Sequence, residues 1–194
     1  MDATKMEAGI RLFLEGLGQR IEGEDLAKTP RRVARAWSED LVSGYAVDPA
    51  AELTYVAAPA GIGPVVLKDI RFSSVCVHHL LPFAGLAHVA YLPDARLAGL
   101  SKLGRVVDAL SRRLQIQEHL TGSIAATIEA ALAPKAVLVV LDAEHTCMTL
   151  RGVRKEGSRL VTYAARGVWE HDAGARGEIL DLFDSGRARP PKEA

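Results

Sequence analysis

The sequence is poor in cysteine and carries no net charge. Only two of its 194 residues are cysteines, and 24 basic residues balance 24 acidic ones. This balance gives no general attraction to nucleic acid or to a membrane surface, so an anion would have to be bound locally. A cytoplasmic chain keeps its thiols reduced. We therefore expect a cytoplasmic protein without a nucleic-acid or membrane partner, whose cysteines are free thiols or metal ligands.

Long apolar runs are missing as well. None reaches the ~18 residues that a membrane-spanning helix needs. The N-terminal stretch "MDATKMEAGIRLF" has acids near its start and lacks the apolar core of a secretory signal. No internal repeat or long linker divides the chain. At 194 residues with 48% hydrophobic side chains, it is long enough for about one domain with a sizeable core.

The pattern of apolar residues predicts an α+β fold. Helical spacing from Met6 to Leu17 ends at Gly18, and a second helix has Thr29 as its cap and Pro30 as its first residue. Antiparallel pairing is favoured, because strands and helices occur in separate groups. The expected order is as follows: helices at 6–17 and 29–44, a connection at 45–62, strands at 65–74 and 86–93, helices at 99–120 and 121–133, strands at 135–144 and 158–169, a helix at 174–184, and a frayed tail.

Each of the two cysteines has a histidine within three residues. Cys76 precedes His78 and His79, and Cys147 follows His145. Thiolate and imidazole suit zinc, and a catalytic zinc keeps three protein ligands and one open position. The alternative is that both cysteines are small buried apolar residues. The chain has no Cys-x-x-Cys pair, which argues against a four-ligand structural site and against a nucleobase deaminase.

Periodicity alone leaves the choice of histidine open. In a regular strand, Cys76 and His78 share one face and His79 points to the other. A ligand role for His79 would require the stretch to bend or bulge, which is common beside active sites.

Two further features indicate an anion site and a base-recognition site. Ser101 is a natural N-cap, so Lys102 and Arg105 would lie in the first helical turn, where cations oppose the helix dipole. A bound anion removes this conflict, and the alternative is a solvated pair of charges. Gln117 and Glu118 would lie near the end of the same helix. One carboxylate can accept both N1–H and the exocyclic amine of guanine, although a lone Glu is usually just solvated.

Five separated stretches together resemble the GTP cyclohydrolase I family. They are "TPRRVARAW", "CVHHLLPF", "GLSKLGRVV", "QIQEHLT" and "HTCMTLRGVRK", in the family's order, and the resemblance runs from about residue 24 to residue 183. It implies the tunnelling fold, a four-stranded antiparallel sheet backed by two helices. An N-terminal helical region would cover 1–50, the catalytic domain 51–186 and a C-terminal tail 187–194. Members form homodecamers with active sites between subunits.

The resemblance also implies roles for individual residues. It implies that zinc is bound by Cys76, His79 and Cys147 and that catalysis depends on His78 and His145. It also implies that the triphosphate is bound by Ser101, Lys102, Arg105, Arg151 and Arg32, and that guanine is recognised by Gln117 and Glu118. The reaction would be the hydrolytic opening of the guanine imidazole ring of GTP, giving 7,8-dihydroneopterin triphosphate and formate for tetrahydrofolate or pterin biosynthesis. His145 would protonate N7, and His78 would assist proton transfers at the ribose.

One position departs from the family. The usual motif reads Cys-Glu-His-His, and here Val77 replaces the Glu. The lost carboxylate could have partnered a basic residue such as Arg32, and its absence changes the charge beside the histidines. Two alternatives to the leading interpretation follow. One is a diverged paralogue with partial or specialised activity, and the other is a non-catalytic assembly protein stabilised by zinc.

Overall fold

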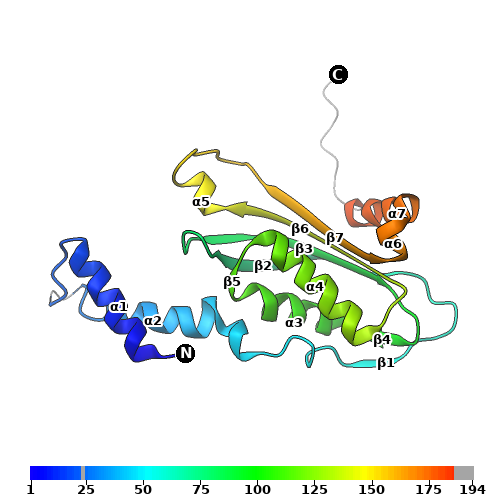
Figure 1. The fold of residues 1–194 in the computed structure, drawn as a ribbon, viewed down its shortest axis with the longest axis horizontal. Helices are drawn as coiled ribbons and strands as arrows, with labels where there is room; N and C mark the ends of the chain where they lie inside the picture. Colours follow the sequence, from blue (N-terminus) through cyan, green and yellow to red (C-terminus); the bar gives the residue numbers. More distant parts are fainter. Residues whose placement is uncertain (23–24, 186–194) are drawn as a thin grey trace, which may run out of the picture.

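The computed structural model describes residues 1–22 and 25–185, and it shows a mixed α+β chain built around one curved sheet (Figure 1). Two helical stretches precede the sheet, two long helices lie against one of its faces, and a C-terminal helix lies against the other. The elements in chain order are α1 Ala3–Gly16, α2 Thr29–Ala36, the π-helical turn η1 Trp37–Leu41, the 3₁₀ turn η2 Ser43–Ala46, β1 Tyr55–Ala57, β2 Val65–Cys76, β3 Pro82–Leu92, β4 Arg96–Ala98, α3 Leu100–Ser111, β5 Leu114–Gln115, α4 Gln117–Leu132, β6 Ala136–His145, α5 Thr146–Thr149, β7 Leu160–Gly167, α6 Val168–His171 and α7 Ala173–Asp184.

The main sheet has the strand order β5-β2-β3-β6-β7. The four long strands pair antiparallel with their sequence neighbours. The expectation of a four-stranded sheet was incomplete, because the two-residue strand β5 adds a parallel partner to the end of β2. Strands β1 and β4 form a separate two-stranded sheet, and β1 lies in the region predicted as a plain connection. No helix in the described ranges has both the length and the apolar character needed to cross a membrane.

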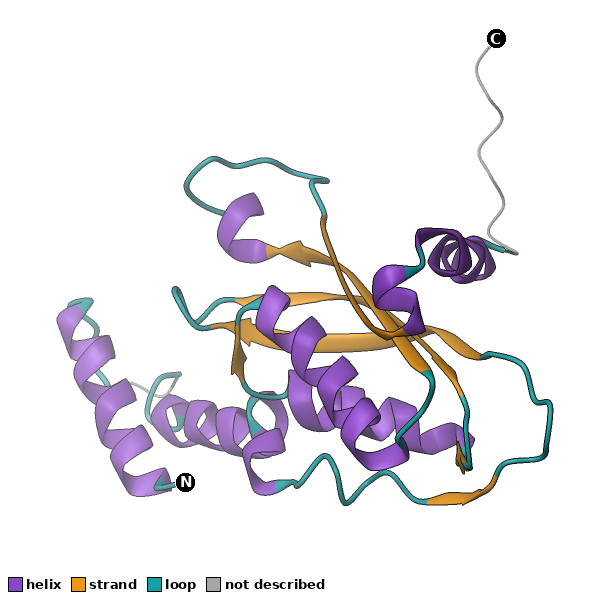
Figure 2. Ribbon diagram, turned by 45° about the vertical axis from the view of Figure 1, so that its right-hand side comes forward, coloured by secondary structure: helices purple, strands orange, loops and turns teal. Residues whose placement is uncertain are grey.

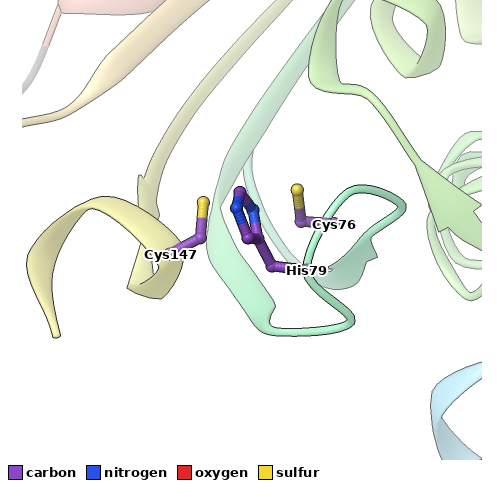
Figure 3. Close-up of side chains that lie close together, drawn as sticks. All are labelled: Cys76, His79 and Cys147. Carbon is purple, nitrogen blue, oxygen red and sulfur yellow. The ribbon is translucent and has the colours of Figure 1, made fainter. Parts of the chain in front are cut away.

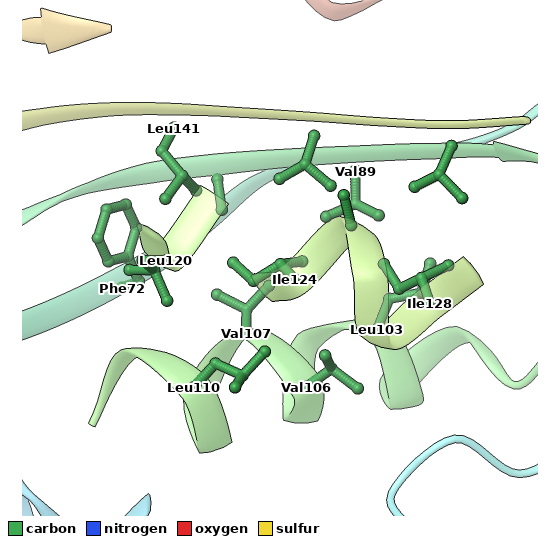
Figure 4. Packing of buried hydrophobic residues seen from close by; sticks show 14 of the residues in the cluster. Phe72, Val89, Leu103, Val106, Val107, Leu110, Leu120, Ile124, Ile128 and Leu141 are labelled. Carbon is green, nitrogen blue, oxygen red and sulfur yellow. The ribbon is translucent and has the colours of Figure 1, made fainter. Parts of the chain in front are cut away.

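The core lies between the sheet and the helices α3 and α4. Strand β6 turns Val137, Val139 and Leu141 toward these helices, and all three side chains are fully buried. Ile124 and Ile128 of α4 meet them from the helical layer (Figure 4). A contiguous cluster of this kind supplies most of the stabilisation that keeps the sheet and the two helices together.

The opposite face of the sheet is also covered, in part. Leu138 of β6 packs against Trp169 of α6 and against Ile179 and Phe183 of α7. Figure 2 shows these two helices on the side of the sheet away from α3 and α4. Because β6 is buried on both faces, its sequence is a continuous apolar run without the alternation of a half-exposed strand.

The chain between α3 and α4 differs from the prediction. A single helix over 99–120 was expected, but α3 ends at Ser111, and Leu114 and Gln115 pair with the end of β2. Helical periodicity is local, and it does not reveal that these two residues gain more from joining the sheet edge. Gln117 and Glu118 therefore begin α4 and do not end α3.

The predicted helix starts also differ from the observed ones, by two residues at α3 and by one at α2. The N-cap of α3 is Gly99, so Ser101 is the second helical residue and Arg105 lies in the second turn. Thr29 is the first residue of α2, and Lys28 occupies the cap position without a side-chain hydrogen bond. The end of α1 matches the expectation, since Gly18 has a φ of 75°. The tail predicted at 187–194 lies outside the described residues.

We expect Gly85→Ala to destabilise the protein strongly. A Cβ at this position of β3 would collide with the carbonyl oxygen of Asp142 in β6 and lie 2.6 Å from the Cα of Ala143. Both atoms belong to the backbone and cannot rotate away, so the strands must separate. Overpacking typically costs ~1–3 kcal/mol, which lowers the thermal midpoint by roughly 2–12 °C in a domain of this size.

Gly122→Ala in α4 is the matched control for this substitution. Its Cβ would meet no atom within 4 Å outside its own helix turn. Alanine is favoured over glycine in a helix by ~1 kcal/mol, so the thermal midpoint of Gly122→Ala should equal or exceed that of the wild type. Equal midpoints for Gly85→Ala and the wild type would contradict the close approach of β3 and β6.

Candidate active site

The predicted metal ligands, catalytic histidines and base-recognition residues lie where the ends of three strands of the main sheet meet the start of α4. Strand β2 ends at Cys76, β3 begins at Pro82 and β6 ends at His145. Because the strands are antiparallel neighbours, these three strand ends lie at the same end of the sheet. The parallel pairing of Cys76 with Gln115 brings in the start of α4 at Gln117. The location therefore follows from the sheet topology.

A tight turn connects β2 to β3 and carries the two adjacent histidines. The amide of Leu80 donates to the carbonyl of Cys76 (2.9 Å), and the amide of Cys76 donates to the carbonyl of Leu81 (2.8 Å). Leu80 has a φ of 56°, a left-handed conformation that reverses the chain. This is the kind of bend that a ligand role for His79 requires.

The turn brings Cys76, His79 and Cys147 together from two distant parts of the chain (Figure 3). One ligand atom from each residue lies within 4.8 Å of the others. Two sulfurs and one imidazole nitrogen form a donor set that suits zinc and leaves room for a fourth ligand. His78 lies outside this group, exposed, with its Nδ1 3.9 Å from the Sγ of Cys76.

The electrostatics of the thiol pair favour a bound cation. Burial raises the pKa of the Cys147 thiol, and the adjacent Cys76 raises it further, while Arg151 lowers it. Two thiolates so close together repel each other when nothing separates them. A divalent ion reverses this balance, because it deprotonates coordinating thiols outright.

Arg151 contacts the third member of the group. Its guanidinium donates to the Nε2 of His79 over 2.9 Å. A metal on Nε2 would take the lone pair that accepts this hydrogen bond. A metal on Nδ1 would leave the proton on Nε2, where it would face the guanidinium. A metal on either nitrogen would therefore remove this hydrogen bond to Arg151.

His145 lies half-buried beside the metal group. Its ring stacks on Phe83, with centroids 4.3 Å apart and planes 6° from parallel. Its Nε2 lies 2.8 Å from the Oε1 of Gln117. Burial lowers the pKa of His145, and the negative charge of the nearby, exposed Glu118 partly offsets that effect. The structure thus brings the catalytic candidate and both candidate base-recognition residues to one place.

The predicted phosphate-binding residues are more scattered. Ser101 is exposed and Lys102 half-exposed on the first turn of α3. Arg105 lies one turn on and pairs with Glu52 at 3.4 Å. Since Arg105 lies beyond the first turn, the conflict with the helix dipole concerns Lys102 alone. Arg32 is exposed on α2, and within the described ranges no hydrogen bond or ion pair joins it to the Cys-His-Cys group.

Three partners of the site residues have no signal in the sequence. Phe83 supports the ring of His145, Thr162 receives a hydrogen bond from Gln117, and Glu52 neutralises Arg105. Each lies far from its partner in the sequence. Only the strand register places Phe83 opposite His145, and a single sequence contains no direct signal of that register.

The family model and the curated relatives agree on one family. A family model described as GTP cyclohydrolase I matches residues 6–184. The GTP cyclohydrolase 1 of Streptococcus agalactiae serotype Ia is 48% identical over 183 residues, which cover 94% of this chain and 97% of the relative. That of Geobacillus kaustophilus is 48% identical over 181 residues, covering 93% and 96%. Among solved structures, the apo form of the archaeosine synthase QueF-Like aligns with a TM-score of 0.47 at 21% identity, over 55% of this chain and 96% of that one.

We expect Cys147→Ala to abolish stoichiometric binding of Zn²⁺. The substitution removes one of three protein ligands and leaves a Cys-His pair, which holds the ion weakly. Zinc per chain should be measured by elemental analysis after dialysis against a weak chelator. The adjacent Met148→Ala is the matched control, because Met148 is exposed and outside the Cys-His-Cys group. Full zinc retention by Cys147→Ala would remove Cys147 from the ligand set.

Proposed function

This chain belongs to the GTP cyclohydrolase I family and is a hydrolase of that type, and we propose that it opens the imidazole ring of GTP to give 7,8-dihydroneopterin triphosphate and formate. One observation supports this most directly. A Cys-His-Cys group with its ligand atoms within 4.8 Å lies beside His145, whose pKa responds to Glu118. A metal-ligand set, a proton donor and a guanine-binding carboxylate are the parts that such a reaction needs.

We propose the tunnelling fold for residues 51–186, after an N-terminal helical region at 1–50. Four long antiparallel strands with α3 and α4 on one face support this assignment. The fifth strand, β5, extends that sheet by two residues.

We propose zinc as the ion held by Cys76, His79 and Cys147. The donor set fits, because two thiolates and one imidazole match the ligand preference of zinc and leave one position for water or substrate. Bound there, zinc would supply a water-derived nucleophile at neutral pH.

His145 and His78 are the proposed proton-transfer residues. His145 would donate a proton to N7 of guanine, while C8 is attacked by the nucleophile. Glu118 favours the protonated form of His145 and so opposes the effect of burial. His78 is exposed on the turn beside Cys76, where it would move protons at the ribose after the base has opened.

Glu118 is the proposed base-recognition residue, and a set of cations is proposed for the triphosphate. The exposed carboxylate at the start of α4 can accept N1–H and the 2-amine of guanine together. The phosphate-binding residues would be Ser101, Lys102, Arg105, Arg151 and Arg32. Arg151 contacts His79 in this structure and would be available for this task if His79 held a metal.

We expect the purified protein with zinc to convert GTP, then inosine triphosphate, then ATP, in falling order. Inosine keeps N1–H but lacks the 2-amine, and adenine presents its N1 lone pair to the carboxylate. A site built to pair a polar group rejects analogues that lack it. Turnover should be followed by the fluorescence and mass of the products. Glu118→Gln should lower kcat/KM for GTP by roughly 10- to 100-fold, because a charge-assisted hydrogen bond contributes ~1.5–3 kcal/mol, and it should flatten the order.

Arg105→Ala is the matched control for base recognition. All three nucleotides carry the same triphosphate, so this variant should raise KM for each of them without changing their order. Equal turnover of ATP and GTP by the wild type would contradict the role of Glu118. Accumulation of a formamide without dihydroneopterin triphosphate would indicate the diverged paralogue.

We further propose that the chain works as a homodecamer with sites between subunits. Helix α1 has no buried residue, and Leu12 and Phe13 on it and Leu17 directly after it are 59–69% exposed. Strand β7 is an open sheet edge with exposed Val161 and Tyr163. Such surfaces are typical of subunit contacts. Other copies would bring Arg32 and further cations to the metal group.

Light scattering of the active fraction should give a mass close to ten times the 20.8 kDa of one chain. An active species of one chain mass would contradict sites shared between subunits. We propose the cytoplasm as the location, because a site with two free thiols suits a reducing compartment.

A further inference from the structure

The side chain of Gln117 is held at both ends inside the protein. It is 1% exposed, although it opens helix α4 next to the exposed Glu118. Its Nε2 faces three acceptors, the carbonyl oxygens of Leu141 (3.1 Å) and Leu160 (2.9 Å) and the Oγ1 of Thr162 (3.1 Å). Exchanging the amide oxygen and nitrogen by a flip would set the oxygen against two carbonyl oxygens. The orientation of the amide is therefore determined.

The oxygen of the Gln117 amide determines which ring nitrogen of His145 carries the hydrogen. Oε1 of Gln117 lies 2.8 Å from the Nε2 of His145. An amide oxygen only accepts, so Nε2 must carry the hydrogen. The neutral imidazole is then the Nε2–H tautomer, in which Nδ1 is the nitrogen with the lone pair. Stacking on Phe83 holds the plane of the same ring.

Further hydrogen bonds hold the backbone of Gln117 and one of the acceptors of its amide. Thr121, one turn along α4, donates to the backbone carbonyl of Gln117 (2.8 Å). The hydroxyls of Thr121 and Thr162 lie 2.6 Å apart. The chain of contacts from His145 through Gln117 to Thr162 joins β6, α4 and β7. A buried network in which each member is satisfied is rigid.

We propose that Gln117 is a positioning residue that acts through His145 and does not itself read the guanine edge. Its two N–H donors are occupied by the protein, and its buried oxygen serves the imidazole, so recognition of N1–H and the 2-amine is left to Glu118. This inference rests on the proposed function, because it assigns Gln117 a task in that reaction. The arrangement resembles the general pattern in which a third group orients an acid–base histidine and selects its tautomer.

The test is a double-mutant cycle with zinc-loaded protein and GTP. Gln117→Met keeps the size of the side chain and removes both hydrogen-bonding ends. We expect kcat to fall about 10- to 100-fold, within the range that acid–base catalysis supplies, with KM changed less than about threefold and the preference for GTP over inosine triphosphate kept. In a His145→Ala background, Gln117→Met should lower kcat by less than about threefold, because the effects of residues that act as a unit are not additive.

Two outcomes of the cycle would overturn the inference. One is an equal loss in both backgrounds, which would mean that Gln117 acts without His145. The other is a loss of discrimination between GTP and inosine triphosphate at unchanged kcat, which would make Gln117 a base-recognition residue. Gln115→Met is the matched control. Gln115 also donates to a backbone carbonyl, that of Leu110 (2.9 Å), and does not contact His145, so its kcat should stay within about twofold of the wild type.

A measurement without turnover keeps the inference testable if Gln117→Met fails to fold. Nitrogen NMR of the full chain labelled with ¹⁵N-histidine distinguishes the two neutral tautomers, and His145→Ala identifies the signals. We expect the Nε2–H form in the wild type and a mixture in Gln117→Met. An Nδ1–H form in the wild type would overturn the inference. If GTP is not converted at all, the proposed function fails, while the tautomer measurement still decides the role of Gln117.

Discussion

The pairing of β3 with both β2 and β6 is the constraint on which the candidate site depends. It sets Pro82 opposite Val75 and Phe83 opposite His145. A slip by one residue would turn every side chain of a strand to the other face of the sheet. The inward-facing Val137, Val139 and Leu141 would then leave the core, so the hydrophobic effect itself resists the slip. The strand register that buries the core residues also places the two thiols and His145 at one end of the sheet.

Two buried polar side chains, those of Gln117 and Thr121, lie near the same end of the sheet. Gln117 and Thr121 are each 1% exposed, and both have hydrogen-bond partners. Leaving such groups unpaired costs ~1–3 kcal/mol each. These hydrogen bonds join α4 to β6 and β7 and complement the apolar contacts. Rigidity is therefore concentrated where His145 needs a constant orientation, whereas Glu118 stays exposed and accessible.

Much of the architecture could be predicted from the sequence, because it depends on local patterns. The α+β order and the buried strand β6 follow from periodicity and from apolar runs. The proximity of Cys76 and Cys147 could be expected from the chemistry of two rare thiols beside histidines. The break between α3 and α4 could not be foreseen, since Leu114 continues the helical stripe but pairs with Val75 in the sheet. The burial of Gln117 depends on three acceptors from β6 and β7, which no local pattern contains.

In the turn after β2, backbone hydrogen bonds set the geometry of the Cys-His-Cys group. The exposed side chain at position 77 affects only the charge beside it. Backbone hydrogen bonds from Leu80 to Cys76 and from Cys76 to Leu81 define the loop. The amide of Val77 donates to the carbonyl of Gln115 (3.1 Å), and Val77 is 42% exposed. These backbone hydrogen bonds do not depend on which side chain stands at this exposed position. A single substitution here can therefore change the charge beside His78 and His79 while the backbone that positions them stays as it is.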